Sequence, residues 1–456
     1  MKISWGLIAG LIVFLYAMLG GQPLGILAFL GLAAFSCLGY KEAIFALFLS
    51  AQLVIINDKI FPITGGVTSS LRWIVLIVAS LSIYMRVFYE RLTVIIWPLV
   101  FLSIFLIIAL VVSNLFGLAP AVSNFKLLIF SLAGVALFQG YTHLPERGAI
   151  DRLLYHGICA FTIANALTIL LFPFHAYRRH FYDGTINALK GTTNQSQVLG
   201  VMVAVAIAWL IARLMSHRDY RNGLTFLCLP LLGYFLLISK ARTGMIALLL
   251  AGILVMFFAL FRRNWLRRLY GPFFRPAVLG ALILIALVGI SQAGAILEVA
   301  TDFALKSGRN GDDLREAFEA SRGERIRELY HGYQERKYTG LGFGMPRQPE
   351  HLKVGYDPLT GVIPIRSETE KNFLFMAVFQ ETGLFGGIAF FVFLGSMVTF
   401  QYRYGSPGGL FVFLTGLMLN VGEAIFFSLG GAGLFVFVIM SSSLLRASTK
   451  EPYATD

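Results

Sequence analysis

The feature that most constrains this chain is a series of long apolar runs that continues almost from end to end. Hydrophobic residues make up 57% of the 456 residues, whereas charged residues make up only 13%. The mean hydropathy is +0.76. A soluble domain cannot bury this much apolar surface, so the lipid bilayer must form part of the solvent of the folded chain. The sequence therefore predicts a polytopic integral membrane protein.

The apolar runs predict about fourteen membrane spans, because a helix needs roughly 20 residues to cross the hydrocarbon core. The predicted spans are 4–20, 24–40, 43–56, 71–85, 93–113, 126–141, 153–173, 195–215, 223–239, 243–261, 277–297, 372–399, 408–421 and 424–446. The runs 43–56 and 408–421 are short enough to be re-entrant, which would leave about twelve spans. We expect an all-α fold with a helix bundle in 1–297, a large loop with amphipathic helices in 298–371, and further spans with a short tail in 372–456.

The distribution of Lys and Arg gives the predicted orientation, because these residues favour the cytoplasmic ends of spans. With the N-terminus inside, 17 of the 37 Lys and Arg residues fall on the inner side, 8 on short outer connections and 12 in the long loop. The cluster from Arg262 to Arg275 fixes its own connection on the inner side. Both termini are therefore predicted to be cytoplasmic, and the loop 298–371 is predicted to lie outside.

Composition also argues against other classes of function. The net charge of +13 does not indicate nucleic-acid binding, since the basic residues are scattered between spans or gathered at their ends. Cys37, Cys159 and Cys228 each lie inside an apolar run and are expected to be small core residues. The predicted outer face has no carboxylate-rich cluster, so we expect neither a metal nor another cofactor.

Five cations on the predicted outer face depart from the charge rule: Arg178, Arg179, Lys190, Lys240 and Arg242. Guanidinium groups bind phosphate in a bidentate way, and a lipid-linked pyrophosphate would hold its charge at this depth. The alternative is that Arg178 and Arg179 extend to lipid headgroups. Arg242 favours the phosphate hypothesis, because a short charged island between two spans has little room to reach lipid.

The long polar loop contains a predicted helix and a predicted helix start. Residues 312–336 predict a helix with an apolar stripe, a pattern that more often packs against protein than binds a ligand. The segment 367–370 has the form of a capping box that would open the next span, so Glu370 is either a cap or a base for a substrate hydroxyl. Glu381 and Glu423 lie in apolar sequence, where an acid is either functional or paired, with Arg242 as one possible partner.

Several short segments together resemble the bacterial O-antigen ligase and O-antigen polymerase superfamily. These segments are Lys190–Gln195 with Leu199–Gly200, Ser239–Gly244, Ser321–Arg322, Gly340–Gly344, Asn372–Leu374 and Gln380–Gly386. The resemblance covers roughly residues 110–445 and rests on the order, the spacing and the shared membrane face of these segments.

The resemblance implies a GT-C-like glycosyltransferase of the bacterial inner membrane that is inverting and metal-independent. It would act at the periplasmic face on a glycan carried by undecaprenyl pyrophosphate. Arg242 matches a position that holds the pyrophosphate in this superfamily. A second such position commonly lies just before the Gly-Thr segment, where this chain has Lys190, with Arg178 and Arg179 a little upstream.

The chain departs from the ligases of the superfamily at the presumed base. These ligases carry a histidine directly before the asparagine that opens the span after the loop, whereas this chain has Lys371 before Asn372. Lysine is protonated at neutral pH and is a poor base. We therefore predict a polymerase of O-antigen or exopolysaccharide repeat units, in which Glu370 or Glu368 accepts the hydroxyl proton and Lys371 contacts phosphate. Arg322 and Asn372 are expected to bind substrate.

Three alternatives stay open at this point. A lipopolysaccharide ligase would transfer the glycan to a lipid A core or another acceptor. A flippase-type transporter would carry polar residues through its spans and often an inverted repeat, and the sequence has neither. A peptidoglycan polymerase of the shape, elongation and division group would carry landmark motifs that are missing here. The expected partners are a glycan on undecaprenyl pyrophosphate, a glycan or lipid acceptor and the lipid bilayer.

Overall fold

The structure is a computed structural model. It describes most of the chain except the two termini, residues 266–322 and several shorter stretches in the connections. The described residues are 21–60, 67–89, 96–143, 147–178, 188–216, 220–262, 265, 323–347, 353–356, 364–368 and 373–446. The predicted spans 4–20 and 277–297 therefore lie outside the described residues, and each of the other predicted spans contains a helix.

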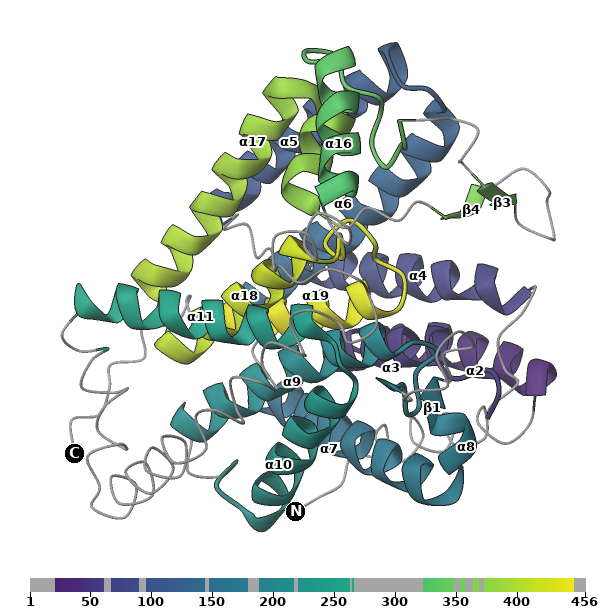
Figure 1. Ribbon diagram of the computed structural model, residues 1–456, viewed down its shortest axis with the longest axis vertical. Helices are drawn as coiled ribbons and strands as arrows, with labels where there is room; N and C mark the ends of the chain where they lie inside the picture. Colours follow the sequence, from purple (N-terminus) through teal and green to yellow (C-terminus); the bar gives the residue numbers. More distant parts are fainter. Residues whose placement is uncertain are drawn as a thin grey trace, which may run out of the picture.

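Helices make up most of the described chain (Figure 1). The α-helices are α2 (Gly21–Ser36), α3 (Tyr40–Val54), α4 (Val67–Tyr89), α5 (Trp97–Leu115), α6 (Pro120–His143), α7 (Arg147–Leu171), α8 (Pro173–Ala176), α9 (Ser196–Ser216), α10 (Gly223–Ile238), α11 (Arg242–Leu260), α16 (Glu324–Glu335), α17 (Leu374–Tyr404), α18 (Pro407–Met418) and α19 (Ala432–Ser442). The 3-10 helices are η4 (Leu419–Val421) and η5 (Ser443–Arg446).

Two antiparallel hairpins depart from the all-α prediction. Strand β1 (Tyr177–Arg178) pairs with β2 (Ala188–Leu189), and β3 (Lys353–Tyr356) pairs with β4 (Pro364–Glu368). Both hairpins lie toward the right of the molecule in Figure 1. They are too short to give the alternating pattern by which a strand is found in sequence.

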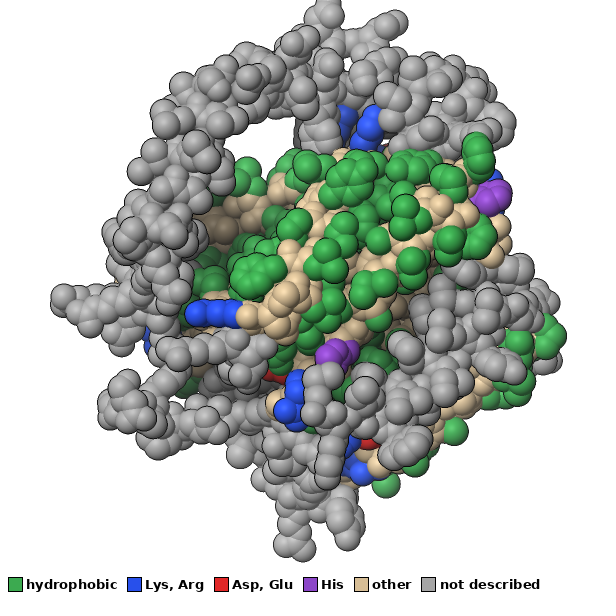
Figure 2. All heavy atoms as spheres, turned by 90° about the horizontal axis from the view of Figure 1, so that it is seen from below, with side chains coloured by type: hydrophobic (Ala, Val, Ile, Leu, Met, Phe, Trp, Pro, Cys, Tyr) green, Lys and Arg blue, Asp and Glu red, His purple; other side chains and the backbone are tan. Residues whose placement is uncertain are grey.

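Seven of the described helices are long and apolar enough to cross a membrane, namely α4, α5, α6, α7, α9, α11 and α17. Their surfaces are apolar as well, since Leu170 of α7 is 74% exposed and Leu249 of α11 is 65% exposed. Figure 2 shows hydrophobic side chains over much of the coloured face. Contiguous apolar surface of this extent suits lipid rather than water. The structure thus agrees with the predicted class of helical, multi-span membrane protein.

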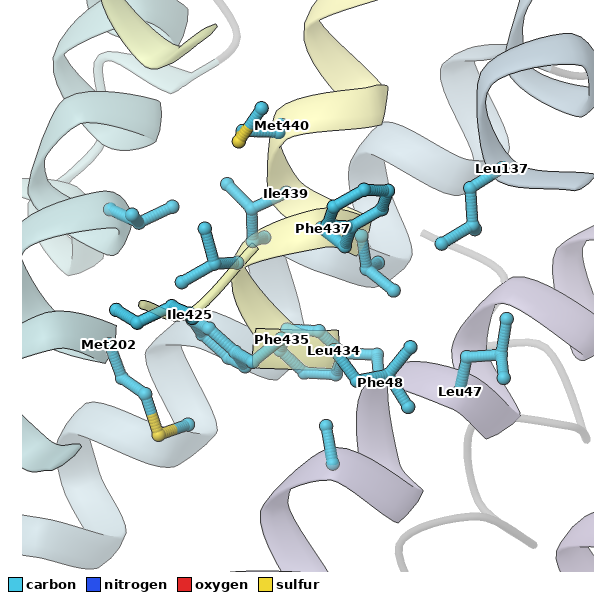
Figure 3. Packing of buried hydrophobic residues seen from close by; sticks show 14 of the residues in the cluster. Leu47, Phe48, Leu137, Met202, Ile425, Leu434, Phe435, Phe437, Ile439 and Met440 are labelled. Carbon is cyan, nitrogen blue, oxygen red and sulfur yellow. The ribbon is translucent and has the colours of Figure 1, made fainter. Parts of the chain in front are cut away.

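Helix α19 lies at the centre of the bundle and packs against α3, α6 and α9 (Figure 3). Its residues from Gly433 to Ser442 are all buried. The ring of Phe435 lies 5.0 Å from that of Phe48 on α3, and Phe437 lies 5.2 Å from Phe138 on α6. A helix that is apolar on all sides is buried either in lipid or among other helices, and here the neighbouring helices enclose it.

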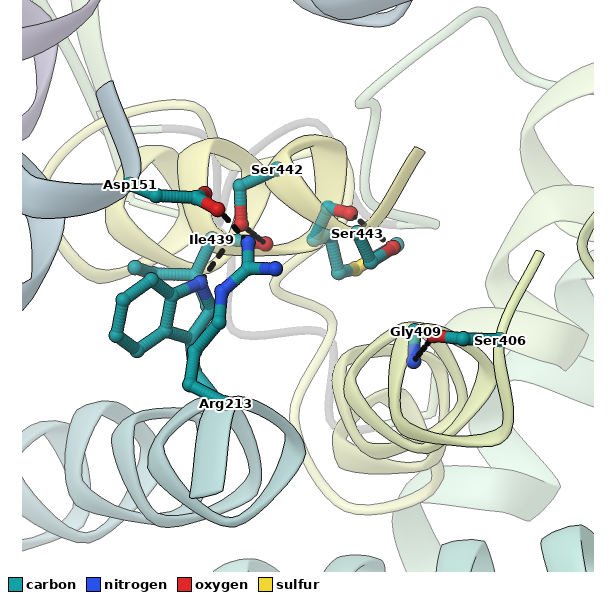
Figure 4. Close-up of polar contacts among 9 residues, drawn as sticks. Asp151, Arg213, Ser406, Gly409, Ile439, Ser442 and Ser443 are labelled. Carbon is teal, nitrogen blue, oxygen red and sulfur yellow. Dashed lines mark hydrogen bonds and ion pairs between the residues drawn. The ribbon is translucent and has the colours of Figure 1, made fainter. Parts of the chain in front are cut away.

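A buried ion pair joins α7 to α9 (Figure 4). The Nη2 atom of Arg213 lies 2.6 Å from Oδ1 of Asp151. The guanidinium also lies over the ring of Trp209, whose indole N–H donates to Oγ of Ser442 on α19 at 2.9 Å. Removing one member of a buried pair leaves an uncompensated charge, so this cluster fixes three helices relative to one another.

The predicted span 424–446 is only partly helical. Helix α19 starts at Ala432, and residues 424–431 form a non-helical segment between η4 and α19. The buried Asn420 stabilises this break, because its Nδ2 donates to the Gly416 carbonyl at 2.9 Å and its Oδ1 accepts from the Phe426 N–H at 2.8 Å. Irregular backbone at membrane depth is tolerated where it lines a cavity, and this segment does so.

The capping-box prediction is wrong. Ser367 and Glu368 lie in strand β4, and α17 begins only at Leu374, where Phe373 occupies the N-cap position without a side-chain hydrogen bond. The sequence pattern matched a box, but hairpin pairing with β3 holds its first two residues extended. The predicted helix 312–336 is present from Glu324 to Glu335, and its earlier part lies outside the described residues.

Candidate functional site

The short connection between α10 and α11 holds Lys240 and Arg242. Lys240 is exposed and has a φ of 54°, which is uncommon for a residue other than glycine. Arg242 is half-buried and is the first residue of α11. The hydroxyl of the buried Ser239 donates to the Leu236 carbonyl at 2.8 Å and so stabilises the end of α10. A tight turn therefore places both cations where α11 begins.

Glycines bring the start of α9 into contact with this connection. A Cβ atom at Gly200 would collide with the Cβ of Ala241, and one at Gly244 would lie 2.8 Å from the Gly200 carbonyl oxygen. Only glycine lets the two backbones approach so closely. The structure thus brings together the segments 190–200 and 239–244, which both belong to the resemblance.

Lys190 is 7% exposed and helps to anchor the segment 188–195 to the end of α3. Its Nζ donates to Oδ1 of Asn57 at 3.2 Å. The Nδ2 group of Asn57 donates in turn to the carbonyls of His175 at 3.0 Å and Gly191 at 3.2 Å. Because Asn57 lies three residues after the last residue of α3, these bonds hold the segment 188–195 against the end of that helix. Lys190 therefore has a structural role in addition to the phosphate contact predicted for it.

The Gly340–Gly344 turn docks onto a break in α17. Gly383 lies inside this helix with a φ of 68° and a ψ of −173°, which interrupts the helical hydrogen bonds. The carbonyl groups that the break leaves without a helical partner accept hydrogen bonds from the turn. The Leu341 N–H donates to the Gln380 carbonyl at 3.0 Å, and the Gly342 N–H donates to the Glu381 carbonyl at 2.9 Å. A Cβ atom at Gly383 would lie 2.5 Å from the Tyr338 carbonyl oxygen. The segments 340–344 and 380–386 of the resemblance thus recognise each other through their backbones.

Gly344 lies between two charged side chains. Its N–H donates to Oε2 of Glu381 at 2.6 Å, and its carbonyl accepts from Nζ of Lys126 on α6 at 2.8 Å. Glu381 is 1% exposed, and a buried carboxylate requires such a bond. Glu381, which the sequence left as a functional acid or a paired one, therefore holds the turn in place.

A cavity of about 200 Å³ opens beside Gly344, between α4, α6 and α17. The charged residues among its described lining are Arg72, Lys126 and Glu381. The guanidinium of Arg72 lies 4.5 Å from the centre of the Trp73 ring, a contact that orients it. The aromatic residues of the lining are Trp73, Phe125, Phe343 and Phe427. An apolar wall with a few polar groups is typical of a ligand site.

The segment 419–431 links this cavity to the Arg242 connection. Phe427 of this segment packs against Phe343 with ring centres 4.8 Å apart. Three of its glycines lie so close to other elements that an added Cβ atom would meet Thr243 at Gly422, Arg72 at Gly430 and Ile55 at Gly431. Ile55 also accepts a backbone hydrogen bond from Asn194 at 2.7 Å. The Arg242 connection and the Gly340–Gly344 turn therefore both lie against the same irregular segment, residues 419–431.

The structure places some predicted site residues and not others. Lys190, Lys240 and Arg242 lie as described above, Arg178 is in strand β1, and Glu368 is in strand β4. Arg179, Arg322, Glu370, Lys371 and Asn372 lie outside the described residues. Pro364, six residues before Glu370, and Leu374, four residues after it, both line the cavity.

Sequence reasoning missed Arg72 and Lys126 as candidate site residues. Both were among the 8 cations counted on short connections of the predicted outer face, but neither falls in a segment of the resemblance. Their position near the start of an apolar run was the available signal, because a charge at membrane depth is costly and calls for a reason.

No group of three or more His, Cys, Asp or Glu side chains suited to a metal is found in the part of the chain that the structure describes. An ion pair between Glu335 on α16 and Arg347, which follows the Gly340–Gly344 turn, holds together the described residues 323–347 of the long loop. The Nε atom of Arg347 donates to Glu335 at 3.0 Å and lowers the pKa of that carboxyl group below its usual value.

No model of a known protein family matches the chain, and no curated protein matches it either.

Proposed function

We propose that the protein is a membrane glycosyltransferase that polymerises glycan repeat units carried on undecaprenyl pyrophosphate. The observation that supports this best is the cavity beside Gly344, because its lining includes Pro364, six residues before Glu370, and Leu374, four residues after it. The cavity thus joins the start of α17, the Gly340–Gly344 turn and two further cations. The GT-C-like architecture, the periplasmic position of loop 298–371 and the cytoplasmic termini belong to the same proposal.

The proposed reaction needs three contributions from the protein. The acceptor hydroxyl oxygen attacks the anomeric carbon of the donor, the bond from that carbon to the pyrophosphate oxygen breaks, and the configuration inverts. The protein orients the two substrates, stabilises the charge that grows on the departing pyrophosphate and takes the hydroxyl proton. Undecaprenyl pyrophosphate is a good leaving group, so cations and one carboxylate suffice for this chemistry.

Arg242 is the proposed contact of the departing pyrophosphate. Its place at the first turn of α11 adds the partial positive charge of the helix N-terminus to that of the guanidinium. The exposed Lys240 lies beside it and is a second contact. The buried Lys190 acts mainly through the segment that it holds against Asn57.

Glu370 is the proposed base. The pairing of Ser367 in β4 removes the capping box that offered Glu370 a purely structural role. Lys371 and Asn372 follow Glu370 directly, and we assign them to phosphate and sugar contacts.

The test uses the purified full-length protein in detergent with lipid-linked repeat units and no lipid A core. Growth of a ladder of longer lipid-linked glycans supports a polymerase, whereas transfer seen only in a parallel reaction with added lipid A core would show a ligase. We expect Arg242→Ala to lower the rate by a factor of about 100 or more, as for loss of a charge-stabilising group. Arg403→Ala, at the exposed end of α17, is the matched control and should leave the rate unchanged.

Glu370→Gln separates a base from a binding group in the same assay. Loss of a base lowers the turnover rate by a factor of about 100 to 10,000 and leaves substrate affinity in place. Full activity of Glu370→Gln would overturn the assignment of the base. Full activity of Arg242→Ala would overturn the assignment of the pyrophosphate contact.

A further inference from the structure

The surroundings of helix α17 change at its break. From Phe373 to Leu384 every residue is buried or half-buried, whereas the exposed apolar side chains begin at Phe385, which is 61% exposed, and continue with Ile388. Residues 384–404 span about 31 Å at about 1.5 Å per residue, which matches the thickness of the hydrocarbon core of a bilayer. The break therefore coincides with one boundary of the lipid core.

Helix α5 ends at the same boundary. It packs along α17, which also carries α16 (Figure 1), and its 19 residues span about 28 Å. The carbonyl of Phe116, directly after α5, accepts from Nη1 of Arg336 at 2.8 Å. The Lys337 carbonyl accepts from the Leu384 N–H at 2.8 Å. Residues 336–338, which follow α16, therefore bridge the ends of two lipid-facing helices.

The side chains of this bridging segment are two cations and an aromatic ring. Lys337 and Tyr338 are exposed, and Arg336 is half-buried. Nζ of Lys337 lies 5.7 Å from the centre of the Tyr338 ring, and that ring lies 6.3 Å from the ring of Phe385. Such side chains place their apolar part toward the lipid tails and their polar end among the headgroups. Positive charge therefore lies beside the point where the exposed apolar surface of α17 begins.

We propose that the surface formed by residues 336–338 and Phe385, called here the Lys337 surface, binds one anionic phospholipid of the adjacent leaflet. The two cations contact the lipid phosphate, since Lys and Arg at a membrane surface attract anionic lipids. An acyl chain lies along the exposed side of α17. Glu335, the nearest acid in sequence, forms an ion pair with Arg347, which offsets its charge. The lipid holds the segment 336–338 against α5 and α17 whatever reaction the protein catalyses.

Native mass spectrometry of the full-length protein in detergent counts bound lipids during titration with phosphatidylglycerol or phosphatidylcholine that carry the same acyl chains. We expect phosphatidylglycerol to bind about tenfold more tightly, because only its headgroup is anionic. Lys337→Gln should weaken phosphatidylglycerol about fivefold and leave phosphatidylcholine unchanged. The matched control is Arg325→Gln, which removes the same charge from an exposed ion pair with Glu328 in the first turn of α16 and should leave both affinities unchanged.

Lys337→Gln should keep the melting temperature of the lipid-free protein, because the backbone carbonyl at this position, and not the side chain, accepts from Leu384. Equal affinities for the two lipids would overturn the assignment, and so would equal weakening by Arg325→Gln. Displacement of phosphatidylglycerol by an equal concentration of glycerol 1-phosphate would show a site for a soluble phosphate in place of a lipid. Glycan growth in a protein without this preference would leave the proposed function intact and remove the lipid site.

Discussion

At the scale of single residues, Gly344 decides where Lys126 lies. Gly344 has a φ of 74°, and a Cβ atom there would collide with the side chain of Lys126 and lie 3.0 Å from its Nζ atom. Alanine at this position is strained by the positive φ, and its Cβ displaces the flexible side chain of Lys126, whose Nζ donates to the Gly344 carbonyl at 2.8 Å. We expect Gly344→Ala to lower the stability of the protein by about 1–3 kcal/mol. The melting temperature of the purified protein measures the change.

A double-mutant cycle shows whether Gly344→Ala acts through Lys126. If it does, the change costs little further stability in a protein that already carries Lys126→Gln, since the two changes remove the same contact. Two losses of stability that add would show that backbone strain at Gly344, and not the loss of the Lys126 contact, accounts for the effect.

At the scale of elements, the break in α17 is the place where the Gly340–Gly344 turn docks. Gly383 combines a φ of 68° with a ψ of −173°, a region that is essentially restricted to glycine and costs other residues about 1–3 kcal/mol. A Cβ atom would also meet the Tyr338 carbonyl. Gly383→Ala should therefore lower the melting temperature of the purified protein and abolish glycan growth.

Gly395 provides the matched control on the same helix. No atom lies within 4 Å of a Cβ atom built at Gly395, and the residue is exposed. Gly395→Ala should stabilise the helix by about 0.5–1 kcal/mol through its higher helix propensity. A drop in melting temperature for Gly395→Ala as large as that for Gly383→Ala would contradict the role of the break.

The sequence predicted the positions of the helices better than it predicted the breaks within them. Apolar runs located the helices, because burial in lipid or in the bundle demands such runs wherever they lie. The break at Gly383 escaped prediction, because the carbonyls beside it accept from the turn at Leu341 and Gly342, far along the chain. The break in 424–431 lies inside an apolar run and is held by the local bond from the Phe426 N–H to Asn420. The cavity also escaped prediction, since Arg72, Lys126 and Glu381 meet only after folding.

The candidate site could be predicted only where one short segment carried the signal. Arg242 sits in a charged island between two apolar runs, and the structure places it at the start of α11. The capping box at 367–370 failed, because a local pattern cannot register pairing with β3. The sequence singled out Lys190 as a cation on the predicted outer face. Its burial against Asn57 could not be predicted, because that contact joins residues 133 positions apart in sequence.

At the scale of the whole molecule, the proposal requires the Arg242 connection and the Gly340–Gly344 turn to lie on one side of the membrane. The predicted orientation places both outside and the end of α17 inside. Cys37, Cys159 and Cys228 are first replaced, and single cysteines are introduced by Lys240→Cys, Tyr338→Cys and Arg403→Cys, at positions that are all exposed.

A thiol reagent that cannot cross the inner membrane reports the outcome in cells whose outer membrane has been made permeable. We expect the cysteines at positions 240 and 338 to react before lysis and the one at position 403 only after it, because the two faces of the bilayer are separate compartments. Reaction of position 240 and protection of position 338 would place the two parts in different compartments. No single glycan could then contact Arg242 and the cavity together, and the glycosyltransferase proposal would fail as a whole.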